Sequence, residues 1–79
     1  MRKRSVVLDG HRTSIALEPE FLLVLDLLAE RRNESFTRLV SRADRERAPT
    51  TPLSSALRVL ALSAAQEEIT PASDGGETR

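Results

Sequence analysis

The side chains that could contact a partner through hydrogen bonds alternate along one stretch near the N-terminus. Two sets of residues alternate there: Arg12, Ser14 and Ala16 on one side, and Thr13, Ile15 and Leu17 on the other. A period of two is typical of a half-buried strand, with its apolar side facing a core. The polar side carries a guanidinium and a hydroxyl, which form hydrogen bonds but do not make a catalytic set. Taken alone, this side is that of an ordinary solvated strand.

No group of residues has the composition of an active site. His11 is the single histidine, and no second histidine or nucleophile–base pair accompanies it. Glu18 and Glu20 stand where acids favour the start of a helix, so they are not read as a pair of catalytic carboxylates. The chain has no cysteine, which excludes disulfides and thiolate metal sites. We therefore expect no enzyme, no metal site and no cofactor.

Length and charge point to a small domain that needs a partner. A chain of 79 residues rarely buries a core worth more than about 3–5 kcal/mol, so oligomerisation is the expected source of further buried area. The net charge is zero, but the basic residues Arg2, Lys3 and Arg4 stand at one end and an acidic stretch at the other. No apolar run is long enough for a membrane span. The expected protein is soluble and cytoplasmic, with no membrane contact.

Two arrangements of the N-terminal residues are open. Asp9-Gly10 is a favoured two-residue turn, so residues 4–8 could fold back on residues 11–17 as a hairpin. That register pairs Leu8 with His11 and Val6 with Thr13. Alternatively, residues 1–10 form a flexible arm, and the strand pairs only with the same strand of a second molecule. The two are compatible, because a hairpin uses only one edge of the strand.

Three helices are expected after the strand. Pro19 suits the first position of a helix that runs to about Arg32, and its apolar surface is wide enough to meet a partner subunit. Asn33 favours a left-handed turn, and Ser35 is the expected N-cap of the second helix. That helix carries one apolar stripe, formed by Phe36, Leu39, Val40 and Ala43.

The third helix is expected to start at Pro52 or Ser54 and to fade near Glu68. Its stripe is formed by Leu53, Leu57, Leu60 and Ala64, widened by Ala56, Val59 and Ala61. The expected organisation has four parts: an arm or outer strand at 1–10, a strand and two helices at 11–48, a third helix at 49–69, and a disordered acidic tail at 70–79.

Three separated motifs stand out along the chain. They are Gly-His-Arg-Thr-Ser-Ile-Ala-Leu-Glu-Pro-Glu-Phe, Ser-Phe-Thr-Arg-Leu-Val and Leu-Ser-Ser-Ala-Leu-Arg-Val, and the match that they support spans roughly residues 4–62. In this order they resemble the ribbon-helix-helix family of small DNA-binding dimers. The last motif is similar to one that opens an added C-terminal helix in a subfamily. The resemblance implies a mainly α fold with a short strand, in which two copies pair their strands antiparallel into one ribbon.

The resemblance also assigns roles to residues. The face of the ribbon away from the core lies in the DNA major groove, which implies base contacts from Arg12, Ser14 and Ala16. The start of the second helix holds a phosphate, which implies contacts from Ser35, Phe36 and Thr37, although Glu34 just before them would repel it unless it points away. Arg2, Lys3 and Arg4 are expected to add phosphate contacts. The dimer core implied is Thr13, Ile15, Leu17, Phe21, Leu25, Leu28, Leu39 and Val40.

Two functions of different classes follow. The first is a homodimeric, sequence-specific transcriptional regulator of a bacterial cell, most simply a repressor, whose partner is double-stranded DNA with a palindromic or tandem operator. The second is a dimeric interaction module, such as an antitoxin or adaptor, that holds a protein partner with its third helix or acidic tail and binds DNA weakly.

Overall fold

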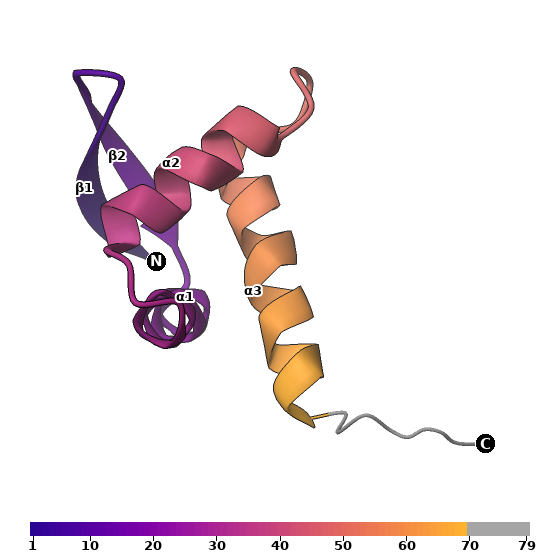
Figure 1. Ribbon diagram of the computed structural model, residues 1–79. Coiled ribbons are helices and arrows are strands. Elements are labelled where there is room, and N and C mark those ends of the chain that lie inside the picture. Colours follow the sequence, from indigo (N-terminus) through magenta and orange to yellow (C-terminus); the bar gives the residue numbers. More distant parts are fainter. Residues whose placement is uncertain (70–79) are drawn as a thin grey trace.

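The structure, a computed structural model, describes residues 1–69, with the backbone alone for residues 68 and 69. Its elements follow in the order β1 (Arg2–Leu8), β2 (His11–Leu17), α1 (Pro19–Arg31), α2 (Phe36–Glu46) and α3 (Leu53–Ile69). The two strands form one antiparallel sheet, with α2 crossing in front of it and α3 standing along the other side (Figure 1). The expected acidic tail lies outside the described residues.

The N-terminal residues form the hairpin, which confirms that interpretation over the flexible arm. Asp9 and Gly10 have φ values of 50° and 79°, the two positive values that a tight type I′ turn requires. The register pairs Leu8 with His11 and Val6 with Thr13, as the Asp9-Gly10 turn predicts. The three helices confirm the expected mainly helical architecture, and each chain contributes two strands of its own to the sheet.

The helix boundaries follow the signals in the sequence. Pro19 opens α1, and Asn33 ends it with a left-handed φ of 59°. The N–H of Glu34 donates to the carbonyl of Ala29 at 3.0 Å, and that of Asn33 donates to Glu30 at 3.0 Å, which is the hydrogen-bond pattern of a Schellman motif. Ser35 caps α2 by accepting a hydrogen bond from the backbone N–H of Arg38 at 3.0 Å. Both helix ends are thus fixed by local hydrogen bonds.

The core lies between the inner face of the hairpin and the three helices. Its fully buried side chains include Leu17, Leu25, Leu39, Val40 and Leu57. Ile15 and Leu28 are also buried, whereas Thr13 and Phe21 are partly exposed. Most residues expected to hold two copies together are therefore covered by the chain's own helices. In this conformation a second copy would have to contact other surfaces.

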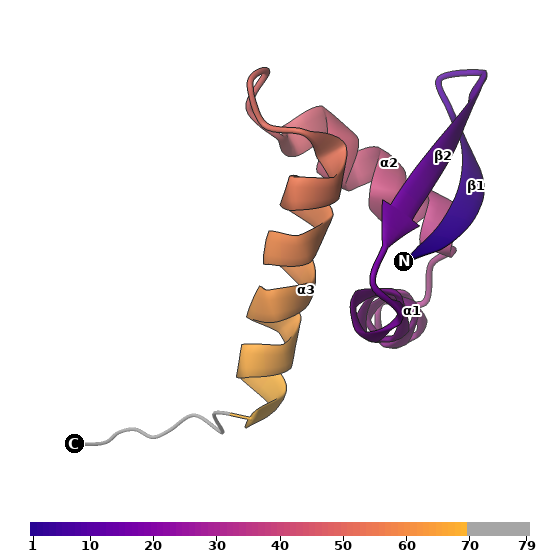
Figure 2. The same cartoon turned by 180° about the vertical axis from the view of Figure 1, so that it is seen from behind.

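The third helix begins at Leu53, one residue after Pro52, and packs on the rest of the chain through Leu57, Ala61 and Ala64. Val59 does not widen this stripe, because 63% of it is exposed. Seen from behind, α3 lies beside both β2 and α1 (Figure 2). Among the described residues no helix has the length and apolarity needed to cross a membrane.

Two arginines tie the elements together over long sequence distances. Arg4 of β1 donates to both carboxylate oxygens of Asp26 in α1, at 2.6 and 3.2 Å. Arg58 of α3 does the same to Glu18, which precedes α1, at 3.0 and 3.3 Å. These hydrogen bonds from Arg58 are the main reason that the pKa of Glu18 is lowered. Each pair fixes one outer element against α1.

Candidate nucleic-acid interface

One face of the hairpin points away from the core and carries side chains of both strands. Directly paired positions across the two strands are Val7 with Arg12, Ser5 with Ser14, and Lys3 with Ala16. All are exposed except Ala16, which is partly exposed. We call these six residues the outer face. It holds the three expected base-contacting residues, Arg12, Ser14 and Ala16, and adds three from β1.

Arg12 is available to a partner. Its side chain is exposed and forms no ion pair with any residue of the described part of the chain. A guanidinium offers several donors in a fixed planar arrangement, which suits the paired acceptors of a guanine edge. Ser14 lies two residues along β2 and offers one hydroxyl, so it selects less sharply between bases.

The outer face meets the beginning of α2. Ser5, Val7 and Arg12 line a hollow of about 330 Å³ together with Val6 and Thr37. Thr37 is the second residue of α2, so the N-terminal end of this helix lies next to the hairpin. Arg12 and Thr37 are 25 positions apart in the sequence, and the fold brings them to one depression.

The first turn of α2 can receive an anion. The N–H groups at a helix start lack partners within the helix, and the helix dipole favours negative charge there. Ser35 is already occupied in capping, since its hydroxyl accepts the N–H of Arg38. The ring of Phe36 packs against the core, with the Arg4 guanidinium carbon 4.5 Å from its centre. What remains for an anion is the backbone N–H of Phe36 and Thr37 and the Thr37 hydroxyl.

Glu34, the acid just before this helix start, is neutralised by its own chain. Its side chain is only 7% exposed, and Oε1 accepts a hydrogen bond from the Arg42 guanidinium. Oε2 is buried without a hydrogen-bond partner among the described residues. The pairing with Arg42 places a positive charge against this carboxylate, which reduces the repulsion that the acid would exert on a phosphate.

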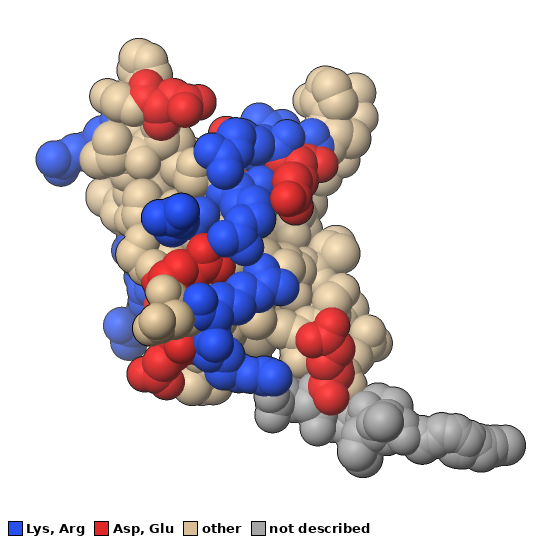
Figure 3. Space-filling model, viewed as in Figure 1, with Lys and Arg blue, Asp and Glu red and all other residues tan. Residues whose placement is uncertain are grey.

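Further arginines, to which the family resemblance assigned no role, surround the start of α2. Arg32, Arg38 and Arg42 line a second hollow with Asn33 and Ser35. Basic side chains gather over α2 and its flanks in the surface view (Figure 3). A helix places residues three and four positions apart on one face. The spacing of Arg38, Arg42 and Arg45 in the sequence therefore indicated that basic side chains gather on one face of α2.

The basic residues of β1 divide into two groups. Arg2 and Lys3 are exposed, whereas Arg4 is held between Asp26 and the Phe36 ring. A phosphate would have to compete with Asp26 for the Arg4 guanidinium. Lys3 therefore has the more accessible charge, and it lies on the outer face.

The second edge of β2 is bordered by α3. Within residues 1–69 the sheet has two strands only, so this edge has no strand neighbour. Residues 13–16 line a shallow hollow there, whose other wall is Leu53 and Ser54 at the start of α3. A further strand added to β2 would have to fit beside that first helical turn.

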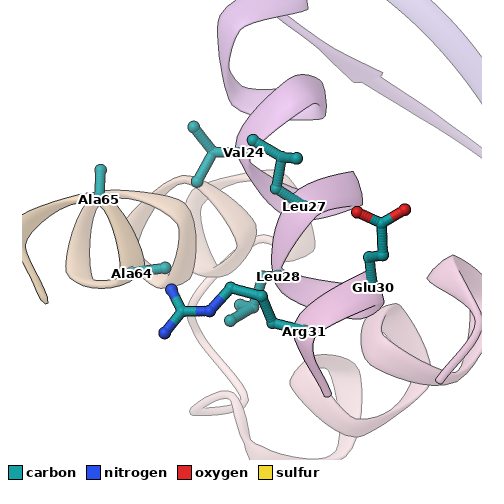
Figure 4. Close-up of a pocket in the computed structure, with 7 residues that line it drawn as sticks. All are labelled: Val24, Leu27, Leu28, Glu30, Arg31, Ala64 and Ala65. Carbon is teal, nitrogen blue, oxygen red and sulfur yellow. The ribbon is translucent and has the colours of Figure 1, made fainter. Parts of the chain in front are cut away.

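A groove of a different kind runs between α1 and α3. It has a volume of about 330 Å³, and its lining includes Val24, Leu27, Leu28, Ala64 and Ala65. The close-up view shows the carboxylate of Glu30 turned away from the groove, while the Arg31 side chain extends towards Ala64 (Figure 4). Leu27 is 51% exposed at its border. The groove offers an apolar surface and few hydrogen-bonding groups.

The comparison with protein families matches residues 1–65 to the ribbon-helix-helix domain. Comparisons with curated proteins and with solved structures gave no match. Ribbon-helix-helix domains are typically found in DNA-binding regulators and are generally non-catalytic. The match covers both strands, α1, α2 and most of α3. The chain belongs to the ribbon-helix-helix domain family.

Proposed function

We propose that this protein is a sequence-specific DNA-binding regulator, most simply a repressor, whose ribbon enters the major groove. The observation that carries the proposal is the hollow shared by Arg12 and Thr37, because it joins a base-reading face to a phosphate-binding helix start. Arg12 bonds O6 and N7 of a guanine, a contact worth about 1–3 kcal/mol of discrimination. Ser14 bonds a neighbouring base edge, and the Ala16 methyl group contacts a thymine methyl group.

Phosphates on either side of the groove fix the position of the ribbon. One phosphate accepts the N–H groups of Phe36 and Thr37, with Arg32 and Arg38 adding charge beside it. Lys3, on the hairpin, contacts the sugar–phosphate backbone of the DNA. These contacts strengthen binding to every sequence and make it dependent on salt, because each one releases counterions from the DNA.

The acting species is a homodimer. Regulators with two-fold symmetry bind operators whose half-sites repeat about one helical turn apart, so the operator is expected to be palindromic or tandem. In the family the ribbon takes one strand from each of two copies, and the free edge of β2 is the edge that such pairing would use in this chain. The mass of the protein in solution tests the dimer: a folded monomer at micromolar concentration contradicts it.

The experiment that tests DNA reading is selection of bound sequences from random double-stranded DNA. The wild-type protein should yield a motif, and Arg12→Ala should lose the preference for guanine at one position of each half-site. Arg38→Ala should bind all sequences more weakly, lower the slope of log affinity against log salt by about 1, and keep the motif. Val59→Ala, an exposed change on α3, is the matched control for both.

Two results would overturn the proposal. A wild-type protein that yields no motif at low salt is not a sequence reader. A motif that survives Arg12→Ala unchanged would mean that another surface reads the DNA.

The groove between α1 and α3 favours a second role, in which the domain also holds a protein partner such as a toxin or an adaptor target. An apolar groove beside an exposed leucine suits an amphipathic helix. Co-expression with the product of a neighbouring gene, followed by purification, tests this role. Ala65→Glu should release that partner and leave DNA affinity unchanged, whereas a partner that remains bound would exclude the groove.

A further inference from the structure

Arg4 is a charged residue on the inner face of the hairpin, where its neighbours along β1 are apolar. The alternation of the strand puts it on the same side as Val6 and Leu8, which are 4% and 8% exposed. The Arg4 side chain itself is 36% exposed. A guanidinium turned towards a core needs partners there, because a charge that leaves water without them is costly. The partners of Arg4 show which elements this side chain connects.

The Arg4 guanidinium contacts two helices at once. Its two terminal nitrogens donate to the two carboxylate oxygens of Asp26 in α1, at 2.6 and 3.2 Å. Its central carbon lies 4.5 Å from the centre of the Phe36 ring. The paired hydrogen bonds need the planar fork of an arginine, and the face of an aromatic ring attracts the same cation. A single side chain of β1 thus joins α1 to the first residue of α2.

Phe36 occupies the position at which α2 can receive an anion. It is the first residue of that helix, and its backbone N–H is one of the two that remain for a phosphate. Across the sheet Arg4 pairs with Ile15, which follows the outer-face residue Ser14 in β2. Arg4 therefore lies between the strand that carries the proposed base contacts and the helix start that is proposed to bind a phosphate.

The spacing between the strand and the helix start decides whether both can contact DNA together. The duplex holds base edges and phosphates at fixed separations, so a ribbon and a helix start that shift against each other lose one of the two contacts. Groups in a binding site need to be held to within about 0.5 Å by supporting hydrogen bonds and packing. Arg4 can supply that support from the inner face, on the side of the sheet opposite the outer face.

We propose that Arg4 is a positioning residue for DNA binding. Together with Asp26 it holds Phe36, and with it the anion-binding start of α2, at a fixed distance from the ribbon. In each copy β2 carries the reading residues, and β1 is the strand that ties β2 to α2. This inference rests on the proposed function, and it gives Arg4 a role other than the phosphate contact that the family resemblance implies.

The experiment uses the full chain and the DNA motif selected with the wild-type protein, with one phosphate at a time replaced by a neutral methylphosphonate. The phosphate held by α2 is the one whose replacement matters less in Thr37→Val, which lacks the hydroxyl at the helix start. At that phosphate the wild-type protein should lose about tenfold or more in affinity, the factor expected for a hydrogen bond to a charged group. Arg4→Met should lose about twofold or less there, because its helix start is no longer held in place.

Two further variants separate positioning from a direct contact of Arg4 with the phosphate. Asp26→Asn keeps the guanidinium but removes its anchor, so the loss at that phosphate should shrink as it does in Arg4→Met. If Arg4 contacted the phosphate itself, Asp26→Asn would free it and the loss would grow. Arg4→Lys keeps the charge but cannot form the paired hydrogen bonds, so it should behave like Arg4→Met. The guanine preference set by Arg12 should persist in all three variants.

Arg58 provides a matched control, because it makes the same two kinds of contact elsewhere in the fold. It donates to both carboxylate oxygens of Glu18, and its guanidinium carbon lies 5.9 Å from the centre of the Phe21 ring. Arg58→Met and Glu18→Gln remove the same groups and charges as the Arg4 and Asp26 variants but loosen α3 instead of α2. Both should keep the full wild-type loss at that phosphate, which separates positioning from a general loss of stability.

An Arg4→Met protein that keeps the full wild-type loss at this phosphate overturns the inference, and Asp26→Asn takes its place if that variant does not fold. A larger loss in Asp26→Asn, or a wild-type protein with no such sensitive phosphate, overturns it as well. In each of these cases the proposed function stands if the motif and its dependence on Arg12 remain. If the wild-type protein selects no motif, both fail.

Discussion

Removing the Arg42 guanidinium should expose the importance of the Glu34 carboxylate. Glu34 is 7% exposed, one of its oxygens has no partner within the described chain, and the other accepts from Arg42. Breaking a buried ion pair costs about 3–5 kcal/mol when a charge is left uncompensated. Arg42 is 37% exposed, so water can partly replace it, and we expect Arg42→Ala to lower the free energy of unfolding by about 2 kcal/mol.

Urea unfolding measures this change. With a slope of about 1 kcal/mol per molar urea for a small domain, the midpoint should fall by about 2 M. Arg45→Ala removes an exposed arginine from the same helix, one with no ion pair in the described part of the chain, and should change stability by no more than about 0.5 kcal/mol.

The same change should weaken DNA binding, because an unpaired Glu34 lies beside the start of α2 and repels phosphate. The double variant Glu34→Gln/Arg42→Ala removes the stranded charge and should recover most of both losses. An Arg42→Ala protein as stable as Arg45→Ala would refute this reasoning. A double variant no more stable than Arg42→Ala would refute the role assigned to the Glu34 charge.

Three further predictions concern the tether of α3, the core and the turn. Arg58 lowers the pKa of Glu18, so the pair stabilises the fold above the ordinary pKa of a glutamate and ceases to do so as pH falls through the lowered value. Thermal melting from pH 7 to pH 2 should therefore show Glu18→Gln less stable than wild type at neutral pH and equal to it in acid; curves that never converge would contradict this. Leu57 is fully buried, so Leu57→Ala should lower the free energy of unfolding by about 2–5 kcal/mol in urea titrations, against a small effect of Leu62→Ala. Asp9→Asn keeps the turn but removes an acid from the ribbon tip, so its DNA affinity should exceed that of the wild type severalfold at low salt and by less at high salt. If the variant and the wild type bind DNA equally well at both salt concentrations, the ribbon tip does not lie near phosphate.

Local signals in the sequence predicted most of the fold. The hairpin register follows from the two-residue turn at Asp9-Gly10, and the inner face then follows from the period of two. Pro19, Asn33 and Ser35 fixed helix ends through backbone geometry and capping, which depend on a few neighbouring residues. Features of this kind are set within one turn of chain, and they were predicted well.

Contacts between distant residues were not predicted. Arg4 was expected to contact phosphate, but the fold pairs it with Asp26. Glu34 was expected to repel phosphate unless it pointed away, and the fold pairs it with Arg42. The stripe predicted for α3 is buried at Leu57, Ala61 and Ala64, but Val59, which was expected to widen it, is exposed. Such contacts depend on how the helices and strands pack together, and local sequence patterns do not indicate this packing.

The most direct test of the reading ribbon is the ratio of affinities for the selected operator and for scrambled DNA, measured at one salt concentration for the wild type and Arg12→Ala. A guanine contact of about 1–3 kcal/mol predicts a fall in this ratio of roughly 5- to 150-fold per half-site. Affinity for scrambled DNA should fall much less, because the lost guanidinium contributes only charge there. An unchanged ratio, or equal losses on both DNAs, would contradict base reading by the outer face of the hairpin.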